Sequence, residues 1–162
     1  MTIAVGGRNL PIGAVVAAIG GAVAAVGTFL AWETLDSAVA SALGESSAIS
    51  GISSGLAGKV AAVLAIAAIA LAVIWIMGIK LPIPPFKAYG FLITSTEGLI
   101  VLAGALCLLA GIWGFLGITK DVNDANALVP GIGAMGMGIF VSIAGAVVIV
   151  VGGLLGTLNK TA

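Results

Sequence analysis

The sequence predicts an all-α protein: a transmembrane antiparallel four-helix bundle with up-down-up-down connections and Gly/Ala-rich seams. Hydrophobic residues make up 61% of the 162 residues and charged residues only 7%, against roughly 25% charged residues in a soluble domain. Four apolar stretches are long enough to cross a bilayer, and small residues recur along each of them at steps of three and four. Residues 1–162 are therefore predicted to form a single four-span membrane domain.

The predicted spans cover about residues 10–32, 58–79, 96–119 and 131–156. Each contains about the 20 apolar residues that a transmembrane helix requires. Backbone groups in lipid must find their hydrogen bonds within the segment, so these stretches are predicted to be helices rather than isolated strands.

Local residues mark where the helices begin and where they cannot continue. Pro11 suits the first turn of the first helix, and Pro130 with Gly131 is predicted to open the fourth. The segment Thr94–Glu97 is predicted to form a capping box ahead of the third helix. Prolines exclude helix through Leu81–Phe86 and favour an extended turn there.

The first external connection, Glu33–Gly58, is the longest and is predicted to contain a short helix, capped by Thr34 and ended by Gly44. The apolar side of this helix, a predicted external-loop contact, consists of Leu35, Val39 and Leu43. We expect it to cover the protein's own bundle; the bilayer surface and a neighbouring molecule are the alternatives. The stretch Glu45–Gly55 is predicted to be a flexible linker, with a lateral contact strip as the alternative.

The third connection, Lys120–Asn126, gathers two carboxylates and two amides. An oxygen-rich loop of this kind could hold calcium, but it lacks the spacing and the terminal Glu of an EF-hand loop. We expect a solvated turn.

Lysine and arginine are distributed unequally between the two predicted sides of the membrane. The side that holds both termini carries Arg8, Lys80, Lys87 and Lys160. The other side carries Lys59 and Lys120 together with most of the acidic residues. Because cytoplasmic loops are rich in Lys and Arg, both termini of this multi-pass protein of the plasma membrane are predicted to be cytoplasmic.

Small residues form a seam along every predicted span. The seams are Gly13, Ala17, Gly20, Ala24 and Gly27; Ala61, Ala65, Ala68 and Ala72; Gly104, Cys107, Gly111 and Gly114; and Gly131, Gly138, Gly145, Gly152 and Gly156. Alternating steps of three and four give a period of about 3.5 residues, which predicts left-handed packing with shallow crossings. Small side chains let helix backbones approach closely, so these residues are the predicted helix-packing positions.

The fourth span carries a second small-residue row at steps of four: Ala134, Gly138, Ser142 and Ala146. If one row serves the bundle, the other is free to meet a neighbouring molecule. Ser142 and Ala146 are therefore predicted to belong to an interface between copies of the chain.

The inventory of reactive residues points away from catalysis. The chain has no histidine, and its single cysteine, Cys107, lies in an apolar stretch, where we expect a small buried side chain rather than a reactive thiol. No span centre carries an ionisable residue, as carriers of protons and ions usually require. Six basic and six acidic residues give a net charge of zero, so no basic surplus attracts nucleic acid. We expect no enzyme activity, no cofactor and no metal.

Three features give the chain a resemblance to the broad group of prokaryotic four-span membrane proteins: Trp32 at the end of the first helix, the segment Ser53–Lys59 entering the second, and the glycine ladder of the fourth. The resemblance covers most of the chain and implies four membrane spans without implying an activity. The chain lacks the mid-membrane carboxylate of the rotary ATPase proteolipid and the loop cysteines of claudins and tetraspanins.

Three functions fit these observations. The first is a structural membrane protein that packs laterally with other copies of itself into a homo-oligomeric assembly. The second is an accessory subunit of a larger membrane complex. The third is a channel or transporter for a neutral solute, which tightly packed small-residue seams make the weakest of the three.

Overall fold

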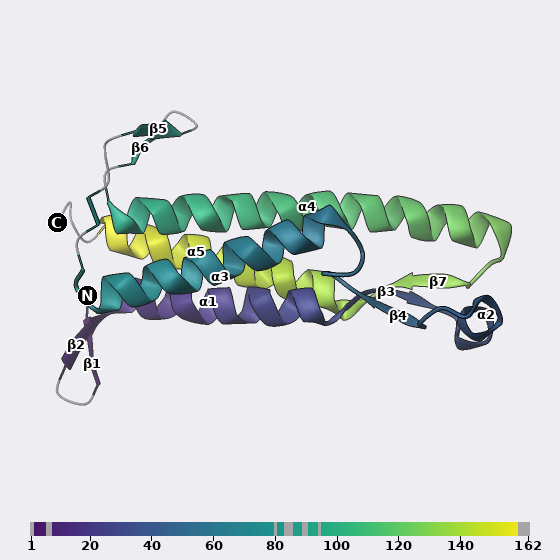
Figure 1. The fold of residues 1–162 in the computed structure, drawn as a ribbon. Coiled ribbons are helices and arrows are strands. Elements are labelled where there is room, and N and C mark those ends of the chain that lie inside the picture. The colour runs from purple at the N-terminus through teal and green to yellow at the C-terminus, as the bar shows by residue number, and fades with distance from the viewer. Residues whose placement is uncertain are drawn as a thin grey trace.

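Four long helices lie side by side in the computed structural model (Figure 1). They are α1 (Ile12–Phe29), α3 (Leu56–Ile76), α4 (Thr96–Leu128) and α5 (Met137–Leu158), and a fifth, short helix is α2 (Ser37–Leu43). The structure describes residues 2–5, 8–79, 81–82, 86–88, 91–93 and 95–158. The chain is mostly helical, as the sequence predicted.

The four long helices are long and apolar enough to cross a membrane, as a multi-pass membrane protein requires. At about 1.5 Å per residue, α1, α3 and α5 measure about 27 to 33 Å, close to the hydrocarbon thickness of a bilayer. Their mean hydropathy over an 18-residue window lies between 2.1 and 2.6. Large apolar side chains such as Val63, Ile66 and Leu109 are exposed on the outside of the helices, where a bilayer would solvate them.

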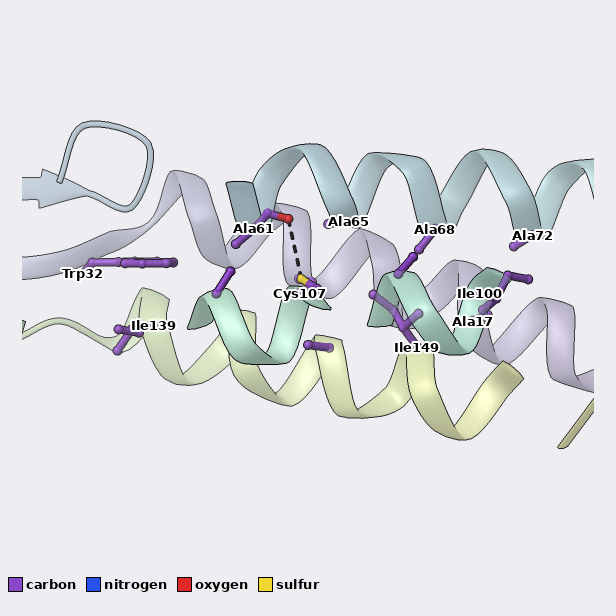
Figure 2. Packing of buried hydrophobic residues seen from close by; sticks show 14 of the residues in the cluster. Ala17, Trp32, Ala61, Ala65, Ala68, Ala72, Ile100, Cys107, Ile139 and Ile149 are labelled. Carbon is purple, nitrogen blue, oxygen red and sulfur yellow. Dashed lines mark hydrogen bonds between the residues drawn. The ribbon is translucent and has the colours of Figure 1, made fainter. Parts of the chain in front are cut away.

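Each long helix packs against two others. Helix α1 packs against α5 and α3, and α4 packs against the same two helices, whereas α3 and α5 touch each other at only a few points. The four helices therefore surround a common interior. Figure 2 shows how this interior is filled: alanines of α3 face Cys107 of α4 and Ile149 of α5, and the Cys107 thiol donates to the Ala61 carbonyl oxygen at 3.5 Å.

The predicted seams form the interior of the structure. All seam residues that lie within the four long helices are buried, and Cys107 is buried with them. Gly131 is the exception, because it lies outside the helix in a turn. It is exposed and has φ +83°, a left-handed conformation that glycine adopts without strain.

Helices α1 and α5 approach each other backbone to backbone. A Cβ atom built on Gly20 of α1 would lie 2.6 Å from the Ile149 nitrogen, and one built on Gly138 of α5 would lie 2.7 Å from the Gly27 oxygen. Gly13 and Gly152 oppose each other in the same way further along the pair. Glycine is therefore required at these positions by the distance between the helices.

The second small-residue row of α5 does not form a separate face, and this prediction was wrong. Ser142 is 1% exposed and Ala146 0% exposed within a single copy of the chain. The Ser142 backbone lies against Gly27 of α1, in the same interface as the first row. Helix α5 packs against both α1 and α4, so it needs a wide strip of small residues rather than a narrow seam.

Several predicted helix boundaries are corrected. Helix α1 ends at Phe29, and Ala31–Leu35 forms a strand instead of a last helical turn. Helix α4 does not end at Thr119 but continues through the predicted turn to Leu128. Helix α5 begins only at Met137, because residues 133–135 are paired in a sheet.

The start of α4 also differs from the prediction. Ser95 is the N-cap, and its hydroxyl oxygen accepts a hydrogen bond from the Gly98 amide at 3.4 Å. The N-cap is therefore one residue later than predicted, and the third residue of the helix is Gly98, which has no side chain to complete a capping box. Thr94 lies outside the described residues.

Two antiparallel hairpins lie at the end of the bundle where α1 begins and α5 ends (Figure 1). One pairs β1 (Thr2–Val5) with β2 (Arg8–Pro11), and the other pairs β5 (Phe86–Ala88) with β6 (Phe91–Ile93). The sequence predicts an extended turn over Leu81–Phe86 but neither hairpin, and residues 83–85 of that turn lie outside the described residues. Lys80 and Lys160 lie outside the described residues.

Candidate functional site

A folded unit extends beyond the other end of the helices, and we call it the sheet module (Figure 1). It contains a three-stranded antiparallel sheet in the order β4-β3-β7, the short helix α2, and the last turns of α4 from Lys120 to Leu128. Its strands are β3 (Ala31–Leu35), β4 (Ala48–Ser50) and β7 (Gly133–Met135). The stretch predicted to be a flexible linker therefore contains a paired strand.

Trp32 closes the junction between the sheet module and the helices. The register of β3 against β4 shifts between Ala31 and Glu33, so Trp32 is the extra residue of a β-bulge. Its side chain is 0% exposed and points toward the helix interior (Figure 2). Cβ atoms built on Gly51 and Gly114 would lie within 3.0 Å of its ring, so glycines on two other segments make room for the indole.

The same junction supplies hydrogen-bond partners for the end of α1. The last carbonyls of a helix have no partner within it. The Trp32 indole nitrogen donates to the Gly27 carbonyl at 2.9 Å, and the Ile52 amide donates to the Thr28 carbonyl at 3.1 Å. The Gly51 amide donates to the Leu30 carbonyl at 3.3 Å. The connection after β4 therefore caps α1 while it passes over the end of the helices.

The extension of α4 covers one edge of the sheet. The Asn126 side-chain amide donates to the Gly133 carbonyl and accepts from the Gly133 amide, both at 3.0 Å. These two bonds use the amide and the carbonyl of Gly133, which point away from β3 and would otherwise form the free edge of the sheet. Val122 packs in the same region, with only 8% of its surface exposed. Residues predicted to form a solvated turn thus hold the sheet against the helix.

The opposite edge of the sheet belongs to β4, and β3 is the one described element that β4 packs against extensively. The Leu35 amide donates to the Ser47 carbonyl at 2.9 Å, and Ala48 pairs with Thr34 across the two strands. In an antiparallel ladder this places the Ala48 backbone groups on the side away from β3. The Ala48 side chain is exposed as well.

Helix α2 forms the connection between β3 and β4 at the far end of the sheet module. Asp36, rather than Thr34, is its N-cap: the carboxylate accepts hydrogen bonds from the Ala38 and Val39 amides. Gly44 ends the helix with φ +69°, as predicted. The proposed apolar side does not cover the bundle, because α2 lies beyond the sheet (Figure 1). Leu35 and Val39 are half-buried, whereas Leu43 is 67% exposed.

Two carboxylates of the sheet module interact electrostatically. Glu33 lies on the central strand and is half-buried, and Asp121 lies on the extension of α4. Burial and, secondarily, the Asp121 carboxylate raise the pKa of Glu33 above 4.5. The folded protein therefore holds the Glu33 proton more tightly than the unfolded chain does. This contribution to stability is present below pH 4.5 and is lost as the pH rises through the folded-state pKa.

We expect the Glu33→Gln variant to be more thermally stable than the wild type at pH 7.5, because it removes a carboxylate that burial disfavours. The difference should be small, since Glu33 remains partly solvated, and should disappear near pH 4. Thermal unfolding in detergent across this pH range measures it. Glu45→Gln, on an exposed residue of the same module, is the control. A Glu33→Gln variant less stable than the wild type at pH 7.5 would contradict the assignment.

Comparison with known proteins found no relative. The chain matches no protein-family model, no curated protein and no solved structure. Within the described residues, no group of three or more His, Cys, Asp or Glu side chains is placed to hold a metal ion. The sheet module and the close α1–α5 contact are therefore the features from which a function must be argued.

The sequence does not predict the residues that build the sheet module, for identifiable reasons. The carboxylates and amides of Lys120–Asn126 predict a turn that includes Asn126, although no Gly or Pro interrupts the chain between Lys120 and Val129. The first helix breakers are Pro130 and Gly131, so their position was the available signal for a longer helix. The strand Ala48–Ser50 is too short to show a periodic pattern of its own.

Proposed function

We propose that this protein is a structural integral membrane protein. Its four long helices cross the plasma membrane as an up-down-up-down bundle, and the sheet module lies outside the membrane. Copies of the chain associate through the sheet module into a homo-oligomeric assembly. In this proposal the bundle anchors the protein in the membrane, and the sheet module makes the contacts with other copies.

The observation that carries this proposal is the rigid connection between the bundle and the sheet module. A single residue separates the end of α1 from β3, a single residue separates β7 from α5, and α4 continues directly into the module. Trp32 and Asn126 then tie these elements together through buried packing and hydrogen bonds. A module attached at three helix ends keeps a fixed position above the membrane, which suits a structural role.

The interior of the bundle supports a structural role over transport. Helices α1 and α5 are in backbone contact along their length, from the pair Gly13 and Gly152 at one end to the pair Gly27 and Gly138 at the other. Cβ atoms built on these glycines would collide with the backbone of the opposite helix. A solute path between these helices would require them to separate along their whole length. The close contact between these helices therefore supports structural association better than transport of a solute.

The charge distribution supports an orientation with both termini in the cytoplasm. Strands β2 and β5, which contain Arg8 and Lys87, lie at one end of the helices, and the sheet module with five acidic residues lies at the other (Figure 1). Cytoplasmic segments are enriched in Lys and Arg. The sheet module would then face the outside of the cell.

Purification of the full chain in a mild detergent tests self-association directly. We expect light scattering coupled to size-exclusion chromatography to give a protein mass of at least two copies of 15.7 kDa. Chemical cross-linking in native membranes should capture the same contact. A single-copy mass in several detergents and in lipid nanodiscs would contradict the proposal. The accessory-subunit function would then take its place, and partner proteins should co-purify from native membranes.

A further inference from the structure

An open groove lies where the start of α3 meets the side of α4. One wall is the segment Ser54–Ala57, and the other follows one face of α4 at steps of four residues: Trp113, Gly117 and Asp121. A Cβ atom built on Gly55 or Gly117 would meet no atom within 4 Å, so the missing side chains leave the groove open. It offers about 460 Å³ of empty space up to its mouth, many times the roughly 30 Å³ that a water molecule occupies.

The depth of the groove in the membrane follows from the helix ends. Helix α3 begins at Leu56 and is about as long as the hydrocarbon layer is thick, so its start marks the edge of that layer. Helix α4 continues past this level into the sheet module (Figure 1). The groove therefore lies at the level of the lipid headgroups. Trp113, 56% exposed at its rim, fits this depth, because tryptophan is enriched at the interface between membrane and water.

The charge in the groove is negative. Among the described residues that line it, Asp121 carries the one charged side chain, and no lysine or arginine is present to neutralise it. Burial raises the pKa of Glu33, and the Asp121 carboxylate adds to this shift, so a second carboxylate lies within electrostatic range. A cationic group in the groove would be attracted by both carboxylates, whereas an anionic lipid headgroup would be repelled.

The wall opposite Asp121 has the complementary polarity. The N-cap of α3 is Gly55, which has no side chain to accept hydrogen bonds from the first amides of the helix. Donors on one wall and a carboxylate on the other match a zwitterion in which a phosphate and an ammonium group are joined by a short linker. Zwitterionic phospholipids present these two groups at the depth of the groove.

We propose that this groove binds the headgroup of one phospholipid with a primary ammonium group, as in phosphatidylethanolamine. The ammonium group donates hydrogen bonds to the Asp121 carboxylate, and the acyl chains descend past Trp113 along the outside of α4. A primary ammonium group has N–H donors for a charge-assisted hydrogen bond, which the trimethylated group of phosphatidylcholine lacks. The inference rests on the proposed function only for membrane insertion, and it adds a lipid site that does not depend on self-association.

Native mass spectrometry of the full-length protein tests the site. The protein in mild detergent receives equal amounts of phosphatidylethanolamine and phosphatidylcholine with identical acyl chains. The wild type should retain phosphatidylethanolamine about fivefold more than phosphatidylcholine, as expected for one partly exposed charge-assisted interaction. Asp121→Asn should bring the ratio close to one. Asp124→Asn is the matched control, because it removes an exposed carboxylate of α4 that does not line the groove, and it should leave the ratio unchanged.

A second pair of variants tests the shape of the groove. Gly117→Leu fills the open space without meeting another atom, so the protein should fold as before but retain severalfold less phosphatidylethanolamine. Leu116→Phe adds bulk at a neighbouring exposed position outside the groove and should retain as much as the wild type. Equal loss in both variants would contradict binding in the groove.

Equal retention of the two lipids by the wild type, or an unchanged ratio in Asp121→Asn, would overturn the proposal. Glycerophosphoethanolamine, the same headgroup without acyl chains, should not displace the lipid at equal concentration. Displacement would show that the groove binds a soluble headgroup rather than a lipid. A homo-oligomer without lipid selection would overturn this inference and leave the proposed function standing. A single-copy protein that selects phosphatidylethanolamine would support the inference and remove self-association from the proposed function.

Discussion

Replacing Gly145 by valine should prevent α1 and α5 from packing and should destabilise the folded protein by about 3 kcal/mol or more. A Cβ atom at this position would lie within 3.0 Å of the Ala24 backbone and 2.7 Å from the Gly20 oxygen. Those neighbours are backbone atoms, which cannot change rotamer to make room. The two helices would have to separate, and the loss of contact would extend along both.

Circular dichroism during titration with a denaturing detergent measures this effect. Gly117→Val is the matched control, because Gly117 lies within α4, is exposed, and has no atom within 4 Å of a built Cβ. The control should unfold close to the wild-type midpoint. Equal midpoints for the Gly145→Val variant and the wild type would show that α1 and α5 are not in backbone contact.

Replacing Trp32 by alanine should cost about 3 to 5 kcal/mol, the range for removing a large aromatic side chain from a core. The side chain is 0% exposed and is surrounded by glycines that cannot fill the space it would leave. The substitution also removes the hydrogen bond to the Gly27 carbonyl at the end of α1. We expect the sheet module to lose its fixed position before the helices unfold.

Limited proteolysis measures this loss, since the sheet module of the Trp32→Ala variant should be cleaved much faster than that of the wild type. Trp113→Ala provides the control, because Trp113 is 56% exposed on α4. Trp32→Phe should fall between the wild type and Trp32→Ala, since it keeps most of the buried volume but lacks the donor. Similar cleavage of the Trp32→Ala and Trp113→Ala variants would contradict the role of Trp32 as the closure of the junction.

The helical part of the fold was predictable because two independent signals agree there. Apolar length fixes how many helices can cross a bilayer, and the spacing of Gly and Ala fixes which side of each helix can approach another backbone. Residues such as Gly20, Ala68 and Gly111 lie in the interior for that reason. The spacing alone does not say how many neighbours a helix has. For this reason the spacing predicts an outer face at Ser142, although α5 uses this residue in its contact with α1.

The sheet module was not predictable from the same signals. Its strands contain three to five residues and owe their existence to pairing between segments far apart in the sequence, such as Leu35 with Gly133. The stretch Ala31–Leu35 looks like the end of an apolar span, and its strand conformation depends on partners that a local pattern does not reveal. The sequence places Trp32 at the end of a span, whereas its burial follows from a bulge that only the paired register shows.

The small side chains of the bundle interior have a consequence for the entropy of folding. Glycine and alanine have no side-chain rotamers to lose, so burying residues such as Ala65, Gly104 and Gly145 between the helices costs no side-chain conformational entropy. Many valine, leucine and isoleucine side chains of the long helices lie on the outside instead, where a bilayer would leave them their rotamers. Apart from a few larger side chains such as Ile100, Ile139 and Ile149, the centre of the bundle therefore consists of residues without rotamers, the reverse of a soluble core, and the backbone carries most of the order.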